Sequence, residues 1–335
     1  MADRTLLDPF PIGWYWVDFS KNLGKNQLRG KKWMGNEVVY WRDRDGRVCM
    51  AKATCPHLGA KLSPNMGGKL HDGCLVCPYH GYTYDATGSC VRTRHGPPNE
   101  HVQLSTFSTV ETGGVLIAFW HPEGQKPDWT PPSMDGPEWS EFTFYKDVIA
   151  AHPQEACENG VDLAHLPHVH GYREVTQIGE PQIEGPMLQT RFKLVRRVGL
   201  PRFIGLNLNV DAIVTLWGLG MSTIEPSMDY AGVYIRQLAM MSPIDEKRTS
   251  FVMGLQLKKI GKPNALVPGL GLLPASLLRH WMRSLFFKIY RHDISQDYVI
   301  WENKDFLKYP RLDSADSSIM RFRRFSQQFY PNPQF

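Results

Sequence analysis

The sequence predicts an α+β protein of two domains: an all-β N-terminal domain over residues 1–130 and a C-terminal domain of mixed strands and helices over residues 131–335. Three observations lead to this prediction. Strand and hairpin signals fill the first 120 residues, prolines crowd the next stretch, and a long helical pattern lies near the C-terminal end. At 335 residues the chain is long enough for two domains and a sizeable core.

The hairpin signals of the first domain are pairs of strand-like segments separated by glycine. The clearest pair flanks Asp45-Gly46, a dipeptide typical of tight hairpins. The predicted pairs are residues 37–42 with 47–53, 82–84 with 89–92, and 104–110 with 115–120. Five prolines then fall within residues 122–137. Because proline neither donates to a strand ladder nor continues a helix, this stretch is predicted to cross between the domains.

The second domain combines strands with one long helix. Strand-like segments cover residues 142–151, 187–195, 207–216, 232–240 and 250–257. Residues 276–304 are predicted to be helical, because their apolar residues recur at helical spacing. The stripe expected to be buried consists of Leu277, Leu278, Trp281, Leu285 and Ile289.

Composition excludes several classes of protein. The net charge of +5 is mild and the Lys and Arg residues are scattered, so no nucleic-acid partner is expected. No basic N-terminal start precedes an apolar run, which gives no sign of a signal peptide, and no stretch of about 18 apolar residues predicts a membrane-spanning helix. Six cysteines at irregular spacing do not form a secreted disulfide framework, so a reducing cytoplasm is expected.

Two loops between the hairpins each carry one cysteine and one histidine. The first reads Cys55-Pro-His57-Leu-Gly, and the second reads Cys77-Pro-Tyr-His80-Gly-Tyr. Two thiolates and two imidazoles can bind zinc tetrahedrally. They can also hold a Rieske 2Fe–2S cluster, with both cysteines on one iron and both histidines on the other. Cys74 forms a second possible pair with Cys77 and is interpreted as a structural neighbour.

Residues 155–172 carry a second cluster of metal-binding side chains. A short helix is predicted over residues 155–166, which places Asp162 and His165 on one face. Pro167 is expected to end that helix, so that the chain can bend and bring His170 beside His165. Two imidazoles and one carboxylate on one side of an iron leave positions open for dioxygen and substrate. The alternative is a histidine cluster that is pH-sensitive or merely exposed.

Together these motifs resemble the Rieske non-haem iron oxygenases. Both cysteine-histidine loops are similar to the ligand loops of Rieske proteins, and about 80 residues later follows Glu158-x3-Asp162-x2-His165-x4-His170. The 19 residues between His57 and Cys77 are slightly long for the family. Respiratory Rieske proteins carry a further cysteine in each loop, where this chain has Ala60 and Tyr79, and this departure favours the oxygenase branch.

The resemblance implies the roles of individual residues. Cys55, His57, Cys77 and His80 would hold the cluster, and His165 and His170 would bind mononuclear iron(II). A third iron ligand would come from a C-terminal helix, where Gln296-Asp297-Tyr298 fits; Asp293 and, in place of His170, His168 are the alternatives. Asp162 would hydrogen-bond an iron-bound and a cluster-bound histidine across a subunit boundary in a homotrimer, and Asn159 would lie near the iron. The family also places an antiparallel sheet flanked by helices around an apolar cavity. Residues that could line it here are Leu206, Leu208, Val210, Val214, Trp217, Leu238 and Met240.

Residues near the C-terminal end narrow the class of substrate that is expected. Residues 300–304, 322–325 and 328–330 resemble the tail shared by 3-ketosteroid 9α-hydroxylases and cholesterol 7-desaturases. The apolar segment 265–278 is interpreted either as a buried loop or subunit contact, or as a gate that admits a hydrophobic substrate and rests on a membrane surface as a peripheral contact.

The expected function is that of a terminal oxygenase that uses O2 to hydroxylate or desaturate a hydrophobic, sterol-like polycycle, a monooxygenase activity. No GxGxxG follows a strand, so electrons are expected from a separate NAD(P)H-dependent reductase, with or without a ferredoxin. Three alternatives remain: oxidative demethylation, ring hydroxylation of a smaller aromatic or secondary metabolite, and an electron carrier without oxygenase activity. The last is disfavoured by the complete set of Asp162, His165, His170 and Asp297.

Overall fold

The computed structural model describes residues 7–332 except 95, 99, 201–203 and 314–315, and the side chains of residues 198–200 and 204–206 are likewise not described. The chain forms two compact units. One contains residues 9–133 and 242–246, here called the cluster unit; the other, the catalytic unit, contains residues 134–241 and 247–335 together with the N-terminal end of the chain. The main crossing falls within the proline-rich stretch, and residues 242–246 return to the cluster unit because Met34 and Gly35 donate N–H groups to the carbonyls of Pro243 and Ile244.

The cluster unit consists of three small antiparallel sheets. Their strand orders are β1-β11-β10, β2-β3-β4-β9 and β5-β6-β7-β8. The strands are β1 Gly13–Phe19, β2 Arg29–Trp33, β3 Asn36–Arg42, β4 Val48–Lys52, β5 Lys69–His71, β6 Cys74–Val76, β7 Thr83–Tyr84, β8 Cys90–Arg92, β9 Thr106–Phe107, β10 Thr109–Thr112 and β11 Val115–Trp120. The first two predicted hairpins are present, and the Asp45-Gly46 turn sets a register in which Trp41 faces Cys49. In the third, residues 109–112 pair with 115–118, while Thr106 and Phe107 pair with β4 instead.

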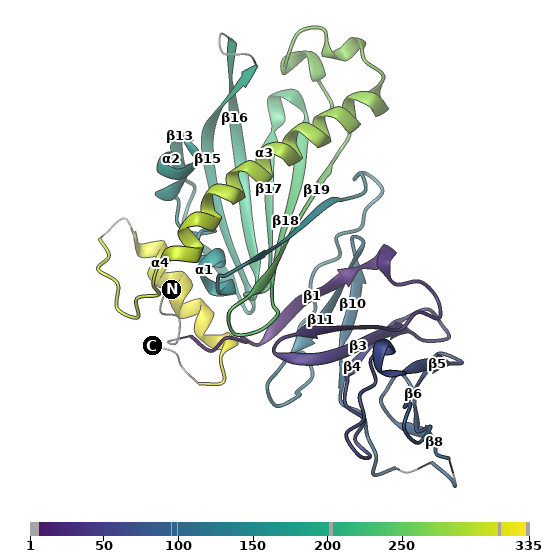
Figure 1. Ribbon diagram of the computed structural model, residues 1–335. Helices are drawn as coiled ribbons and strands as arrows, with labels where there is room; N and C mark the ends of the chain where they lie inside the picture. The colour runs from purple at the N-terminus through teal and green to yellow at the C-terminus, as the bar shows by residue number, and fades with distance from the viewer. Residues whose placement is uncertain (1–6, 95, 99, 201–203, 314–315, 333–335) are drawn as a thin grey trace. The chain divides into compact units, whose positions relative to one another are not determined.

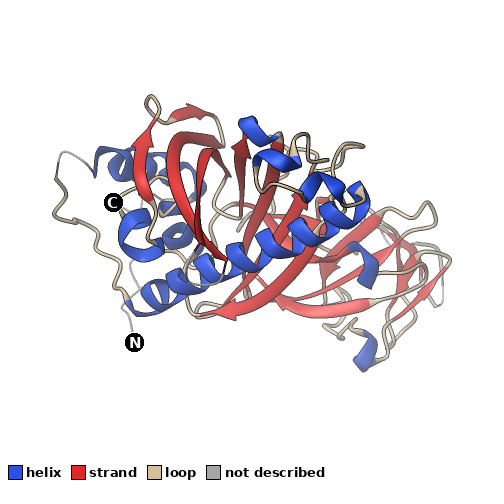
Figure 2. Cartoon of the chain, turned by 90° about the horizontal axis from the view of Figure 1, so that it is seen from above, coloured by secondary structure: helices blue, strands red, loops and turns tan. Residues whose placement is uncertain are grey.

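The catalytic unit is built on one antiparallel sheet of eight strands, ordered β12-β19-β18-β17-β16-β15-β13 with β14 paired to β15. The strands are β12 Thr143–Ile149, β13 Arg173–Gln177, β14 Gln182–Glu184, β15 Met187–Leu200, β16 Ile204–Trp217, β17 Met221–Met228, β18 Val233–Pro243 and β19 Thr249–Leu257. The helices are α1 Pro153–Glu158, α2 His165–His170, α3 Ala275–Asn303 and α4 Ser317–Ser326. Figures 1 and 2 show α3 running across this sheet, and it packs on β12 and β19.

One central strand was not predicted. Pro226 argues against a central position for β17, because proline removes a ladder hydrogen bond. The structure accommodates it at a gap in the ladder between β17 and β18, where Glu225 and Pro226 have no ladder partner on β18 while the register stays the same from Ile224 to Ser227.

Helix α3 is present as predicted, but its buried stripe is shifted. Leu277 and Trp281 are 55% and 45% exposed. The buried residues are Leu278, Met282, Phe286, Phe287, Tyr290, Asp293, Asp297 and Trp301. Apolar content alone missed this face because its C-terminal half carries two aspartates that face the interior. Leu285 and Ile289 are half-buried and pack against the core.

A buried ion pair connects helix α1 to helix α4. Arg323 donates to both carboxylate oxygens of Glu158, at 2.7 and 3.3 Å, and to the carbonyl of Leu307 at 2.7 Å. Both charged side chains are nearly inaccessible to water. Since a buried charge without a partner is costly, this pair fixes the end of α1, immediately before the histidine segment. No helix in the described part of the chain is both long and apolar enough to cross a membrane.

We expect Arg323→Ala to lower the free energy of unfolding by about 3 kcal/mol, because it leaves Glu158 buried with only Lys304, 3.8 Å away, as a cationic neighbour. Urea unfolding measures this loss. Arg321→Ala is the matched control, since Arg321 pairs with the exposed Glu180 at 3.2 Å and should lose at most about 1 kcal/mol. Equal losses in both variants would contradict a structural role for the Glu158 pair.

Candidate metal centres

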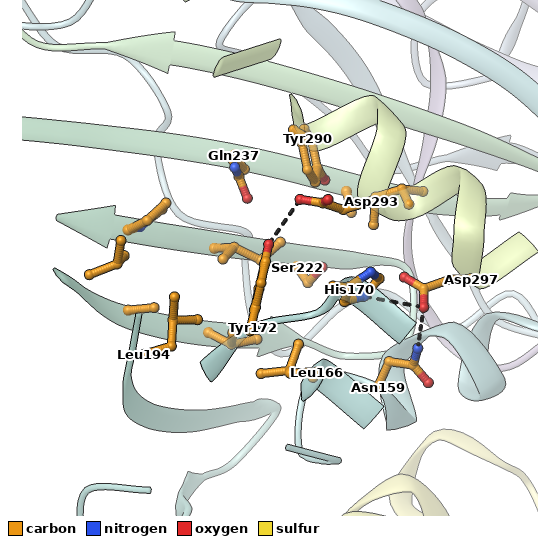
Figure 3. Close-up of a pocket in the computed structure, with 18 of the residues that line it drawn as sticks. Asn159, Leu166, His170, Tyr172, Leu194, Ser222, Gln237, Tyr290, Asp293 and Asp297 are labelled. Carbon is orange, nitrogen blue, oxygen red and sulfur yellow. Dashed lines mark hydrogen bonds and ion pairs between the residues drawn. The ribbon is translucent and has the colours of Figure 1, made fainter. Parts of the chain in front are cut away.

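His165, His170 and Asp297 come together in the catalytic unit. One ligand atom from each lies within 4.8 Å of the other two. His170 Nε2 is 3.5 Å from Asp297 Oδ1, and the two imidazole centroids are 5.2 Å apart. Helix α2 supplies both histidines and α3 supplies the aspartate, which Figure 3 shows beside His170. The arrangement provides two imidazoles and one carboxylate, the ligand set of a facial mononuclear iron site.

The local backbone differs from the expected single helix over residues 155–166. Helix α1 ends at Glu158, turns follow, and α2 begins at His165. Pro167 does not end a helix but lies in the first turn of α2, where the N–H that proline lacks would have no intrahelical partner. Gly171, with φ of 66°, ends α2 in the left-handed conformation that favours glycine. His165 and His170 therefore stand at the two ends of one short helix.

Hydrogen bonds on the far side of each ring orient both histidines. His165 Nδ1 contacts the backbone carbonyl of Asp162. His170 Nδ1 is 3.0 Å from the side-chain oxygen of Gln296. If each Nδ1 carries the proton that these acceptors require, each Nε2 keeps its lone pair for a metal. Burial lowers the pKa of His165, which keeps that ring neutral and able to coordinate. The donor set thus fits a divalent metal.

The carboxylate of Asp297 is buried beside these rings. Burial, followed by the charges of Asp293 and Asp162, raises its pKa to about 7. Asn159, the residue that caps the C-terminal end of α1, donates its amide to Asp297 Oδ1 at 3.3 Å. Asn159 therefore lies against the candidate ligand, where it can hold that oxygen in place.

Asp162 lies next to the site through its backbone. Its carboxylate accepts from the N–H of Ala164 at 3.0 Å and lies 3.9 Å from His165 Nδ1. Within this chain, the carbonyl of Asp162 and not its carboxylate contacts the imidazole. The predicted contact with a cluster-bound histidine of another subunit stays a prediction.

The two alternative ligands have other positions. His168 is exposed on α2. Asp293, one turn before Asp297, forms a bidentate ion pair with Arg196 and accepts from the hydroxyl of Tyr172 at 2.9 Å. Sequence reasoning did not find Arg196, Tyr172 or Gln296. Only Gln296 had a local signal, since it adjoins Asp297, whereas Arg196 reaches the site from a distant strand.

A cavity of about 200 Å³ opens beside the three candidate ligands. Its walls are mostly apolar side chains of the sheet and of α3, as Figure 3 shows. Leu208, Val210 and Val214 line it as expected, while Trp217, Leu238 and Met240 do not. On β18 the lining residues are instead Ile235, Gln237, Ala239 and Met241, because alternate residues of a strand face opposite sides. The side chain of Leu206 lies outside the described residues.

The cluster unit brings the four other predicted ligands into two matching loops. In each loop the cysteine N–H donates to the carbonyl five residues later, and its carbonyl accepts from the glycine N–H four residues later. Gly59 and Gly81 have φ of 77° and 71°, a conformation that glycine adopts without strain. These bonds are Cys55–Ala60 at 2.8 Å, Gly59–Cys55 at 2.9 Å, Cys77–Tyr82 at 2.8 Å and Gly81–Cys77 at 3.1 Å.

The cysteines lie inside and the histidines lie near the surface. Cys55 and Cys77 are buried, whereas His57 and His80 are half-buried with ring centroids 5.0 Å apart. Tyr84 places its hydroxyl 3.0 Å from the Cys55 sulfur. Two buried thiols and two outer imidazoles fit a 2Fe–2S cluster with one iron on each pair. Cys74, the remaining candidate in this region, is half-buried on β6.

Two family models together match most of the chain. Residues 13–121 match the Rieske [2Fe-2S] domain, and residues 118–330 match the 3-ketosteroid 9alpha-hydroxylase C-terminal domain. The chain belongs to this family of Rieske non-haem iron oxygenases. It is the terminal oxygenase component of a multi-component monooxygenase system, in which a separate reductase supplies electrons from NAD(P)H. The expected fold class, enzyme class and cofactors (a Rieske 2Fe–2S cluster, mononuclear iron and O2) are thereby confirmed.

Curated relatives extend over nearly the entire chain. Cholesterol 7-desaturase of Caenorhabditis elegans is 27% identical over 342 residues, which cover 96% of this chain and 77% of that protein. The oxygenase component of 3-ketosteroid-9-alpha-monooxygenase from Rhodococcus rhodochrous is 25% identical over 339 residues, covering 96% and 83%.

Solved structures share the fold at lower identity. Caffeine-bound Pseudomonas putida CBB5 NdmA QL mutant gives a TM-score of 0.68 at 16% identity and covers 97% of this chain and 91% of its own. Dicamba monooxygenase bound to dicamba gives 0.61 at 18% identity and covers 95% and 96%.

His170→Ala should remove the mononuclear iron and all turnover while leaving the visible spectrum of the cluster intact, because the two ligand sets belong to different units. His80→Ala should abolish the cluster spectrum and spare the mononuclear iron. Elemental analysis and absorption spectroscopy of anaerobically purified protein measure both. His168→Ala serves as the control, since this exposed ring lies outside the group and should keep both metals. Full activity in His170→Ala would contradict the assignment of His170 as an iron ligand.

Iron binding should release about one proton from Asp297 at pH 6 and few at pH 8, because its pKa of about 7 leaves the metal-free carboxyl largely protonated at the lower pH. The raised pKa also means that this group favours the folded metal-free protein below pH 4 and progressively disfavours it as pH rises toward 7. Calorimetric titration with Fe(II), in buffers of different ionisation enthalpy, counts the protons. In Asp297→Asn, the number of protons released should no longer differ between pH 6 and pH 8. If proton release by the unaltered protein does not depend on pH, the assignment of Asp297 as an iron ligand is contradicted.

Proposed function

We propose that the substrate is a sterol or a steroid-like polycycle, which this enzyme hydroxylates or desaturates. The observation that carries the proposal is the shape and lining of the cavity beside His165, His170 and Asp297. The named activities of the curated relatives, on cholesterol and on 3-ketosteroids, support the same substrate class.

The cavity is long and apolar. It follows α3 from Asp297 back to Phe286, eleven residues that span about 16 Å at the rise of an α-helix. Leucine, valine, isoleucine and methionine side chains from β15, β16 and β18 form the facing wall. Such a lining binds by removing apolar surface from water, so it favours a rigid hydrocarbon skeleton over a small polar molecule.

The charges in the cavity disfavour an anionic substrate. Among the described lining residues Arg196 is the one Lys or Arg, and Asp293 occupies both of its terminal nitrogens, at 2.6 and 2.9 Å. A substrate carboxylate would have to break this pair and leave Asp293 unpaired. A benzoate-like acid is therefore a poor fit.

Two neutral polar groups remain for a substrate oxygen. The side chains of Ser222 and Gln237 face the cavity and make no hydrogen bond to another residue that the structure describes. They lie on neighbouring strands, where Ser222 faces Ala239 and Gln237 faces Ile224. An amide and a hydroxyl can both pair with a hydroxyl or keto oxygen without adding charge. This pattern supports a polycycle with one oxygen substituent.

Residues of the catalytic unit would position the metal. His165, His170 and Asp297 would hold the iron. The backbone carbonyl of Asp162 and the side chains of Gln296 and Asn159 would orient these ligands through the contacts described above. When bound, the iron and the cluster supply the reductive activation of dioxygen that an unactivated C–H bond requires. We also infer a location in the reducing cytoplasm, where Cys55 and Cys77 would stay available as cluster ligands and would not form disulfides.

Turnover of a matched panel tests the substrate. With a surrogate reductase and NADH, we expect products from cholesterol or a 3-ketosteroid and none from a substituted benzoate, measured by mass spectrometry. Gln237→Leu should raise KM for the oxygenated steroid by about tenfold with little change in kcat, since it removes one neutral hydrogen bond. Product from the benzoate alone would overturn the proposal and favour a small aromatic substrate or demethylation.

We also infer a homotrimer in which the cysteine-histidine loops of one subunit serve the His165–His170–Asp297 site of the next, as the family resemblance implies. A chain with His80→Ala and a chain with His170→Ala should each be inactive. When co-expressed with different tags and purified as mixed assemblies, they should recover part of the activity. Within this trimer, Asp162→Asn should keep both metals but lose most turnover. No recovery in assemblies verified to be trimeric would contradict the arrangement.

A further inference from the structure

The segment that leads into α3 is exposed and apolar. It contains the short turns η4 Pro263–Ala265 and η5 Leu270–Leu272, which Figure 1 shows preceding the N-terminal end of α3. Leu272 is 89% exposed, Leu273 41%, Leu277 55% and Trp281 45%. Leu277 and Trp281 are four residues apart and share one face of the helix. These four side chains form what is here called the apolar patch.

The patch is held by buried anchors on both sides. Leu266 and Leu278 are buried in the core of the catalytic unit. Lys262 N–H donates to the carbonyl of Ala231 at 2.8 Å, and Gly271 N–H donates to Asn264 Oδ1 at 2.7 Å. Because the ends of the segment are fixed, its exposed leucines are presented to the surroundings rather than folded into the core.

The charged residues along this stretch of the sequence have a single sign. Residues 258–292 contain seven Lys or Arg and no Asp or Glu. Four of these cations, Lys259, Lys262, Arg279 and Lys288, make no ion pair with any described residue. Cationic side chains without local partners attract an anionic surface. A protein partner would not require this combination, whereas an anionic bilayer matches both the apolar side chains and the charge.

The patch lies close to the substrate cavity along the axis of one helix, although Phe286 is turned by about 180° from Leu277 and by about 140° from Trp281 around that axis. On α3 the exposed Leu277 and Trp281 precede Phe286, which lines the cavity, by nine and five residues. The distance from Trp281 to Phe286 is therefore about 8 Å along the axis. Sterols are stored in membranes, so this inference rests on the proposed substrate class and extends it.

We propose that the apolar patch and the four cations of the same stretch of chain dock the catalytic unit on an anionic lipid bilayer, from which the hydrophobic substrate enters the cavity. Leu272, Leu273, Leu277 and Trp281 insert at the level of the headgroups, and the cations contact lipid phosphates and carboxylates. Contact of this kind is peripheral and reversible, and it weakens with salt.

Flotation of the iron-loaded protein with vesicles tests the docking. We expect binding to phosphatidylcholine vesicles that contain phosphatidylserine, and less to phosphatidylcholine alone. The triple variant Leu272→Ser, Leu277→Ser, Trp281→Ser should bind on the order of a hundredfold more weakly, because it removes three inserted apolar side chains. Lys259→Glu, Lys262→Glu, Arg279→Glu should lose the preference for phosphatidylserine. Leu307→Ser with Tyr309→Ser, which changes two side chains that are 59% and 81% exposed elsewhere, should bind like the unaltered protein.

Two binding results overturn the inference: no binding to any vesicle, or equal binding by all variants. A third result that overturns it is a smaller assembly of the triple serine variant in light scattering, because the patch would then be a contact between copies of the chain. Turnover separates this inference from the substrate proposal. The triple serine variant should keep its kcat on sterol supplied in cyclodextrin and slow only on sterol in vesicles. If the protein floats with the vesicles but converts no sterol, the docking surface is supported and the proposed substrate class is refuted. If it converts sterol without floating, only the docking surface is refuted.

Discussion

The contact between Asp297 and His170 is the constraint on which the catalytic unit depends. A buried carboxylate beside two imidazoles is unfavourable without a cation, as the raised pKa of Asp297 indicates. The structure nevertheless holds the three groups in place through Gln296 on one ring, the Asp162 carbonyl on the other and the amide of Asn159 on the carboxylate. These contacts therefore offset the free-energy cost of holding the metal site in place before a metal binds.

Two ionic contacts secure the elements that carry these ligands. Glu158 and Arg323 join α1 to α4 just before the histidine segment. Arg196 and Asp293 join β15 to α3 one turn before Asp297, with the Tyr172 hydroxyl on the same carboxylate. Each pair is shielded from water, so removing one partner would strand a charge. The second pair also neutralises the cavity wall, which leaves Ser222 and Gln237 as its polar groups for a neutral substrate.

The two metal centres are built by different means. In the cluster unit, short loops with a glycine in the left-handed conformation place cysteine and histidine close together in sequence. In the catalytic unit, a 29-residue helix carries Asp297 to histidines more than 120 residues earlier. The first design is local and leaves a recognisable motif. The second depends on how α3 crosses the sheet, so a change in helix packing would displace a ligand without touching any motif.

The sequence by itself determined the family, the hairpins of the cluster unit, the long C-terminal helix and the candidate ligands, because fixed spacings in turns and short helices express these features locally. It did not determine which face of α3 is buried, since Asp293 and Asp297 interrupt the apolar pattern on that face. Nor did it predict β17, where Pro226 is tolerated only because the neighbouring ladder is interrupted. The pairing of Arg196 with Asp293 and the orientation of Gln237 into the cavity were decided by tertiary structure, because they depend on strand register and helix crossing between residues distant in sequence.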